Sequence, residues 1–348
     1  IKWLAESKKL TMGTSAGVYM LYGSETNLVV TPFRFTINRE SSFSATDTPP
    51  VVVSNALMYA QIGGKDVQQL LFEGQQGQWF NSKISIKGYD IIKASQISKM
   101  VWQERPNNVI WLMMNDGRLL SLSYDRQTSF QAWSEHAIAG TNAKVVDIEM
   151  IATATHDQIW LKVERTINGS TATYMETIAR FPTEGALSRN NYVFLDSSIT
   201  TTQSSGVVSG LSHLVGESVG VYYDGMQHVN KTVSGSGTIT LDNTSGSDVV
   251  VGLSYNGEIE TLEPTAPENQ YSYSKQVKNI SILIEDSLGI EVEYEDLSEE
   301  ILFRTSGDLM GKQIDLFSGK RKLSLSGMGW DEFGIKVISN GPFPMQIN

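Results

Sequence analysis

The stretch Val109-Ile-Trp-Leu-Met-Met-Asn-Asp-Gly-Arg-Leu-Leu120 decides the fold. It places one apolar run on each side of Asn115-Asp116-Gly117, whose residue types tolerate the positive φ angles of a tight hairpin turn. Short apolar runs bounded by turn residues are typical of paired β-strands. The stretch therefore predicts an antiparallel hairpin.

The same layout of strand, turn and strand occurs four times along the chain. The four segments begin at residues 10, 57, 109 and 159, so they are 47, 52 and 50 residues apart. They comprise Leu10–Leu21, Leu57–Lys65, Val109–Leu120 and Ile159–Thr177. A period of about 40–50 residues with about four strands per unit is typical of β-propeller blades. Residues 1–203 are therefore predicted to form propeller-like repeats of four strands.

Tryptophan recurs at one position of the repeat. Trp111 follows Ile110 and Trp160 follows Ile159 in consecutive units. Aromatic side chains at such positions either pack between sheets or form a platform on which a ligand stacks. We favour packing, and predict that four tryptophans belong to the structural core, namely Trp102, Trp111, Trp133 and Trp160.

The repeat rhythm stops near residue 204. Residues 204–263 are rich in Gly, Ser and Thr but still alternate in hydropathy, which predicts a small inserted β module. Strand patterns return over residues 264–348, where a closing blade and a sandwich-like sheet both fit. No amphipathic helix longer than about three turns is predicted. The predicted fold class is all-β.

Bulk properties exclude several functions. The net charge of −11 argues against a protein that wraps nucleic acid, because binding phosphates requires a Lys/Arg-rich surface. The chain has no cysteine, which excludes disulfides, thiolate metal sites and cysteine-based catalysis. No apolar run approaches the 18 residues of a membrane span. The first residues, Ile1–Leu4, show neither an initiating Met nor a signal peptide, as expected of a fragment or a processed chain.

Five separated blocks, in the same order, resemble the tail nozzle (tail tubular protein B) family of short-tailed bacteriophages. The longest contains Trp102, Pro106 and Trp111, then Asp116-Gly117, then Ala132-Trp-Ser-Glu-His136. The others are Trp3-Leu4 with Gly13–Gly17, Val208–Val219 with Asp224-Gly225, Leu316–Gly319, and Gly329-Trp-Asp331 with Pro342–Pro344. Ser123 and Gln127 depart from the family pattern, which usually has Thr and Glu-Gln there.

The resemblance implies a non-enzymatic structural protein of the virion tail. A member of this family would be assembled in the host cytoplasm as a ring, expected to be a hexamer. The ring would lie below the adaptor and portal rings, contact tail fibres, and form the channel through which double-stranded DNA leaves without specific binding. No cofactor is expected.

An acidic run lies between Glu285 and Glu300. Within it Glu291, Glu293 and Glu295 alternate with Ile290, Val292 and Tyr294, so a strand there would place three carboxylates on one face. That face is either a solvated surface, the wall of a DNA channel, or a Ca²⁺ or Mg²⁺ site. We take Glu291, Glu293 and Glu295 as candidate channel-facing residues.

Catalytic and metal signatures are missing from the sequence. The four histidines, His136, His156, His213 and His228, form no close pair of the kind that zinc sites use. No G-x-S-x-G elbow or Walker A loop occurs. We therefore predict no catalytic, cofactor-binding or metal-binding residue. Two alternatives remain, a receptor- or carbohydrate-binding propeller and a propeller glycosidase, which would need two carboxylates about 5–10 Å apart in a cleft.

Overall fold

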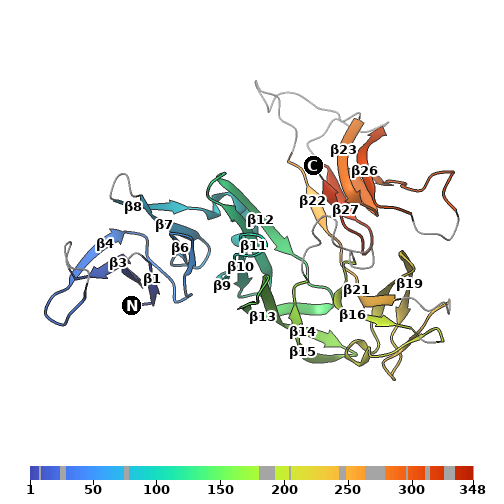
Figure 1. Ribbon diagram of the computed structural model, residues 1–348, viewed down its shortest axis with the longest axis horizontal. Helices are drawn as coiled ribbons and strands as arrows, with labels where there is room; N and C mark the ends of the chain where they lie inside the picture. The colour runs from blue at the N-terminus through green and yellow to red at the C-terminus, as the bar shows by residue number, and fades with distance from the viewer. Residues whose placement is uncertain are drawn as a thin grey trace. The chain divides into compact units, whose positions relative to one another are not determined.

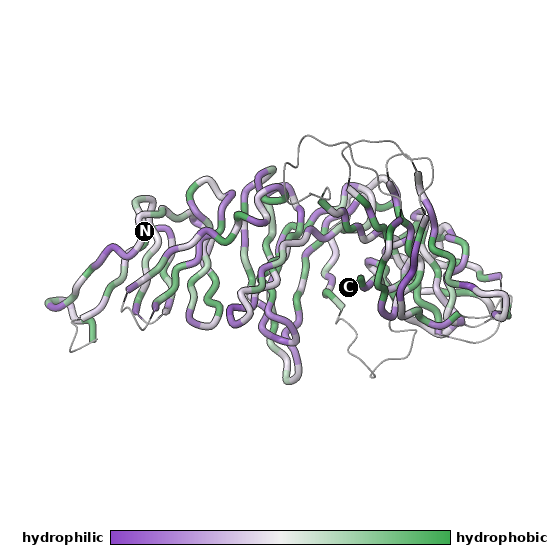
Figure 2. Tube along the Cα trace, turned by 90° about the horizontal axis from the view of Figure 1, so that it is seen from above, coloured by the Kyte–Doolittle hydropathy of each residue, from purple (hydrophilic) through white to green (hydrophobic). Residues whose placement is uncertain are grey.

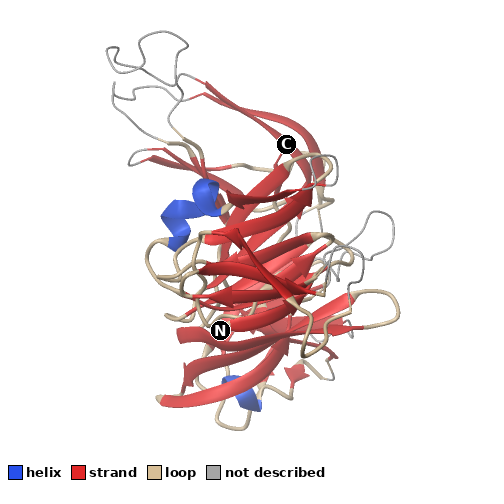
Figure 3. Ribbon diagram, turned by 90° about the vertical axis from the view of Figure 1, so that its left-hand side faces the viewer, coloured by secondary structure: helices blue, strands red, loops and turns tan. Residues whose placement is uncertain are grey.

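The computed structural model describes residues 1–7, 9–23, 29–73, 78–179, 193–203, 205–242, 248–262, 279–294, 297–309, 314–324 and 334–347. It is 59% strand and 4% helix, with several four-stranded antiparallel sheets, which confirms the all-β prediction (Figure 3). The described helices are single turns: η1 (Ser85–Gly88), α1 (Tyr89–Ile92) and η3 (Ser212–Leu214).

The chain divides into two compact units. The first contains residues 1–138, 142–166 and 171–180, and the second contains residues 139–141, 167–170 and 181–348. The boundary therefore lies near residue 180, earlier than the predicted end of the repeats at residue 203. The two units are described separately below.

The first unit is a succession of antiparallel sheets in chain order (Figure 1). Three sheets have four strands each, and the fourth has three described strands. The first sheet contains β1 (Trp3–Glu6), β2 (Leu10–Thr14), β3 (Gly17–Tyr22) and β4 (Thr36–Ser41). The second contains β5 (Val51–Val53), β6 (Ala56–Ala60), β7 (Val67–Glu73) and β8 (Gln78–Lys83). The third contains β9 (Ile97–Gln103), β10 (Val109–Met114), β11 (Leu119–Asp125) and β12 (Phe130–His136). The fourth contains β13 (Thr141–Ala152), β14 (Asp157–Ile167) and β15 (Ser170–Thr177).

The predicted repeat corresponds to these sheets. Its four segments begin in β2, β6, β10 and β14, and each of these is the second strand of its sheet. Each pairs with the strand that follows it in the chain. In the predicted turn Asn115-Asp116-Gly117, Gly117 has a φ angle of 91°, and in the turn between β14 and β15 Asn168 and Gly169 have φ angles of 48° and 76°. The recurrence every fifty residues is therefore a recurrence of the same hairpin.

Apolar side chains fill the space between successive sheets. Trp3, Val18 and Met20 of the first sheet share a buried cluster with Leu57, Tyr59 and Leu70 of the second. Met58 and Ala60, on the second sheet, share another with Ile110, Leu112 and Leu122 of the third. Trp111 and Leu119 share a third cluster with Ile159, Leu161 and Val163 of the fourth.

A sheet with a neighbour on each side is buried at consecutive positions of its central strands, because successive side chains point to opposite faces. β6 (Ala56–Ala60) satisfies this requirement, since all five of its residues are buried. The first four residues of β11 are also buried. Figure 2 shows that short hydrophobic stretches alternate with hydrophilic ones along the whole trace.

The second unit begins with a small β module. Its main sheet has the order β16-β21-β18-β19, and a two-stranded ribbon pairs β17 with β20. The strands are β16 (Asp196–Thr202), β17 (Val207–Val208), β18 (Ser218–Tyr223), β19 (Met226–Thr232), β20 (Ile239–Thr240) and β21 (Asp248–Leu253). β16 was placed in the repeats by the sequence, but its hydrogen bonds to β21 place it in the sheet of the module.

The C-terminal strands form two sheets around one apolar cluster, as in the sandwich alternative. One sheet has the order β22-β27-β24-β25 and the other β26-β23-β28. The strands are β22 (Glu258–Glu260), β23 (Asn279–Ser287), β24 (Ile290–Tyr294), β25 (Leu297–Glu300), β26 (Phe317–Ser324), β27 (Lys336–Ser339) and β28 (Gln346–Ile347). Ile280, Ile282 and Ile284 face Ile290, Val292 and Val337 across this core.

Candidate functional site

The predicted acidic strand is β24 (Ile290–Tyr294). Ile290, Val292 and Tyr294 are buried, whereas Glu291 and Glu293 are half-exposed, so the carboxylates lie on the outer face of the sheet. Glu295 lies outside the described residues. The alternation follows directly from the two-residue period of a strand whose apolar face covers a core.

Neighbouring strands extend this acidic face. Glu291 is opposite Glu300 of β25 and Ile338 of β27, and Glu293 is opposite Lys336. On the far side of β27, Glu258 is opposite Ile338, and Glu260 is opposite Lys336. Residues directly opposite each other in antiparallel strands point to the same face. We call this the acidic face: Glu258, Glu260, Glu291, Glu293 and Glu300, with Lys336.

Lys336 partly neutralises the acidic face. Its Nζ lies 2.9 Å from an Oε1 of Glu258, and this hydrogen bond and charge, with smaller contributions from Glu260 and Glu293, raise the pKa of Lys336. Ser298 donates a hydrogen bond to Glu291. One ammonium beside five carboxylates leaves the face strongly negative at neutral pH.

The acidic face does not provide the convergent ligands that a metal ion needs. In the part of the chain that the structure describes, no group of three or more His, Asp or Glu residues could hold a metal ion. Ca²⁺ requires six to eight oxygens around one point. The face can repel anions and attract counterions.

Three of the predicted core tryptophans lie in the third sheet. Trp102, Ile110, Leu122 and Trp133 form one row across β9, β10, β11 and β12. Trp102 and Trp133, at the two ends of the row, pack against the cluster shared with the second sheet. The Trp133 indole donates to the backbone O of Ile84 at 3.3 Å and leaves no room for a Cβ at Gly88.

Trp111 and Trp160 occupy equivalent positions. Trp111 lies in the cluster between the third and fourth sheets, and its Nε1 donates to Gln103 Oε1 at 2.9 Å. Ile159 faces that same cluster, so Trp160 points to the opposite face of β14. Trp160 is half-buried, and its Nε1 is buried without a hydrogen-bond partner.

The polar residues of the longest family-like block connect strands. Arg118 donates to Asp116 and Glu135, both at 2.9 Å, and to the backbone O of Ile91. His136 Nε2 lies 2.8 Å from Ser121 Oγ, and its ring lies 4.8 Å from that of Trp111. Burial lowers the pKa of His136, so the ring is neutral at pH 7. These contacts are structural.

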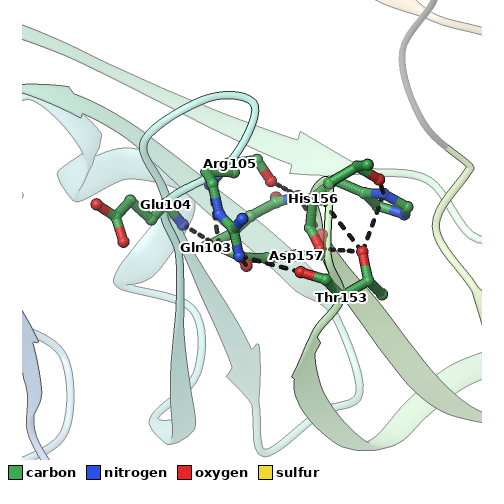
Figure 4. A network of polar contacts seen from close by, with 7 residues as sticks. Gln103, Glu104, Arg105, Thr153, His156 and Asp157 are labelled. Atoms are coloured by element: carbon green, nitrogen blue, oxygen red, sulfur yellow. Dashed lines mark hydrogen bonds and ion pairs between the residues drawn. The ribbon is translucent and has the colours of Figure 1, made fainter.

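A buried carboxylate, Asp157, joins the third and fourth sheets (Figure 4). Its Oδ2 accepts hydrogen bonds from the backbone N of Glu104 and of Arg105, both at 3.0 Å, and its Oδ1 accepts from Arg105 Nη2 at 2.9 Å. Burial alone would raise the pKa of Asp157, but these donors outweigh it and the pKa lies below its ordinary value. Gln103 Nε2 donates to the backbone O of Asp157, which completes the connection.

Two polar contacts could not be predicted from the sequence. Asp157 lies 52 residues from Arg105, and nothing in either segment marks the pairing. Arg165 is fully buried and forms a bidentate ion pair with Glu176, in which Arg165 Nη2 lies 2.9 Å from Glu176 Oε2. A buried charge in a strand that otherwise alternates polar and apolar residues cannot be recognised before its partner strand is known.

The remaining histidines lie apart from one another. His213 Nε2 is 3.0 Å from the backbone O of Ser197, and the His228 ring stacks on Tyr223 with centroids 3.6 Å apart. His156 contacts Thr153 and Thr155. None of these contacts, nor those of His136, joins one histidine to another.

Comparison with known proteins adds no identification. No protein-family model matches the chain, and no curated protein matches its sequence. Among the described residues, no helix has both the length and the hydropathy that a membrane-spanning helix requires.

Replacing Asp157 tests the connection between the sheets. We expect Asp157→Asn to lower the free energy of unfolding by about 1.5–3 kcal/mol at pH 7, because hydrogen bonds to a charged group are lost. Since the folded pKa is depressed, this contribution is complete above the unfolded pKa of about 3.9 and disappears as the pH falls through the folded value. The two proteins should therefore converge in stability once the pH is below the folded pKa of Asp157.

Urea denaturation at several pH values measures this difference. Asp90→Asn is the matched control, because the Asp90 side chain is 89% exposed and should contribute less than about 0.5 kcal/mol. A variant as stable as the wild type at pH 7, or a difference that does not change with pH, would contradict the assignment.

Proposed function

We propose that this protein is a structural subunit of the tail nozzle of a short-tailed bacteriophage, without enzymatic activity. It would be assembled in the host cytoplasm, become part of the virion tail, and form a ring below the adaptor and portal rings. The repeated sheets of the first unit would be blades of a propeller. Tail fibres would contact the outside of the ring.

One observation carries the proposal. The block that resembles the family, residues 100–136, folds as a single sheet, and its motif residues are used for packing rather than for chemistry. Trp102 and Trp133 end one apolar row, and Trp111 packs on the opposite face. Arg118 and His136 tie neighbouring strands together. Motif residues that pack between sheets and connect strands are what a structural protein requires.

The acidic face supports the channel part of the proposal. DNA carries one negative charge per about 1.7 Å of its axis, so a wall of carboxylates repels it and prevents it from adhering. In a ring of six copies, the five glutamates of the acidic face would be repeated around the channel. Such a wall would let DNA pass without specific binding.

The assembly state tests the ring. Native mass spectrometry of the purified chain at about 1 µM should find six copies of the 38.4 kDa chain, about 230 kDa. A six-fold ring seen by negative-stain microscopy of the same sample would support the nozzle. A monomer that binds glycans would instead indicate a carbohydrate-binding protein and contradict the proposal.

Charge reversal on the acidic face tests the channel. In particles reconstituted with Glu291→Lys and Glu293→Lys, we expect slower DNA release, because the introduced ammonium groups would bind phosphates and release counterions. The effect should weaken as salt is added, since screening reduces the attraction.

The control carries the same charge change in the first unit, as Glu73→Lys with Glu104→Lys. Release can be followed by the fluorescence of a DNA dye after receptor-triggered opening. If the Glu291/Glu293 variant releases DNA at the wild-type rate, or if the control slows release equally, the acidic face does not line the channel.

A further inference from the structure

The turn between β14 and β15 presents an Asn-Gly pair, Asn168-Gly169. Both residues are exposed, and their φ angles of 48° and 76° lie in the left-handed region. An asparagine followed by glycine can close a succinimide ring on its own backbone, because glycine has no Cβ to obstruct the approach of its amide nitrogen to the asparagine side chain. The pair therefore has a reactivity that its role in the turn does not use.

The sequence has two other Asn-Gly pairs, Asn256-Gly257 and Asn340-Gly341, and both are packed. A Cβ built on Gly341 would clash with Gln227 Oε1, and a Cβ built on Gly257 would lie 3.7 Å from that of Ser339. A Cβ built on Gly169 would meet no heavy atom of the described residues within 4 Å. Ring closure requires the peptide plane between asparagine and glycine to rotate, so the pair with open space around its glycine is the one that can react in the folded protein.

We propose that Asn168 is a site of spontaneous deamidation. The backbone nitrogen of Gly169 loses its proton to hydroxide and attacks Cγ of Asn168, so a carbon–nitrogen bond forms and the side-chain amide nitrogen leaves as ammonia. Water then opens the succinimide at either carbonyl, which gives aspartate or isoaspartate at position 168. The net reaction consumes one water and releases one ammonia, without an oxidant or a reductant.

The new carboxylate would lie beside an existing one. The backbone N of Asn168 donates to Glu217 Oε1 at 3.3 Å, and this contact joins the β14–β15 turn to the segment that precedes β18. Like charges at such short range repel each other. Deamidation would therefore weaken the contact with Glu217, and the fraction of weakened contacts would increase with the age of the protein. This modification is independent of the proposed ring and channel.

Peptide mapping by mass spectrometry tests the site. The intact protein is incubated at mildly alkaline pH, folded in one sample and unfolded in urea in the other. In the folded sample Asn168 should convert at least about tenfold faster than Asn256 and Asn340, whose packed backbone must first open locally. In urea the three should convert at similar rates, because each is followed by glycine and none is packed. Equal rates in the folded sample overturn the proposal, as does an Asn168 that converts in urea but not in the folded protein.

A variant tests the consequence. Asn168→Asp should lower the hydrogen-exchange protection factor of the amide at position 168 at least about twofold, and salt should reduce the difference by screening. Adding Glu217→Gln should remove the salt-dependent difference, because no second carboxylate remains. Asn256→Asp, the control, makes the same charge change at another Asn-Gly pair and should leave this amide unchanged. An unchanged protection factor in Asn168→Asp, or an equal loss in the control, contradicts the proposed effect on the contact.

Discussion

Face-to-face packing of apolar sheets is the constraint on which the first unit depends. A strand presents alternate side chains to opposite faces, so a sheet between two neighbours is buried at consecutive positions rather than at every second one. β6 and β11 have this pattern of burial, and the clusters on their two sides are different clusters. Because burial of aliphatic side chains is non-directional, polar contacts must fix which sheet meets which.

Asp157 and Trp133 provide such directional contacts. Asp157 of the fourth sheet accepts backbone hydrogen bonds from the loop after β9, and the Trp133 indole fits against Gly88. The contacts that Asp157 and the Trp133 indole make are those of structural groups, not of catalytic ones. The sandwich of the second unit follows the same rule with one difference: its sheets have only one covered face, so β24 alternates and its outer face is free to carry charge.

Much of this could be predicted from residue order alone. Turn residues predict the hairpin around Asn115-Asp116-Gly117 and its recurrence. The two-residue period of a strand predicts that Glu291 and Glu293 lie on one face of the sheet and Val292 on the other. What could not be predicted depends on partners distant in sequence. The ion pair of Arg165 with Glu176, the pairing of β16 with β21 and the contribution of Glu258 to the acidic face each require knowledge of which strands become neighbours.

Native-state hydrogen exchange tests most directly whether the apolar interfaces hold the first unit together. If they do, the amides of β6–β7 and β10–β11 should exchange only through one shared unfolding event, with the highest and equal free energies of opening. Amides of the outer strands β4, β8 and β12 should open at lower free energy. Separate free energies for β6–β7 and β10–β11, or values no higher than those of the outer strands, would show that each sheet is stable by itself and would contradict this account.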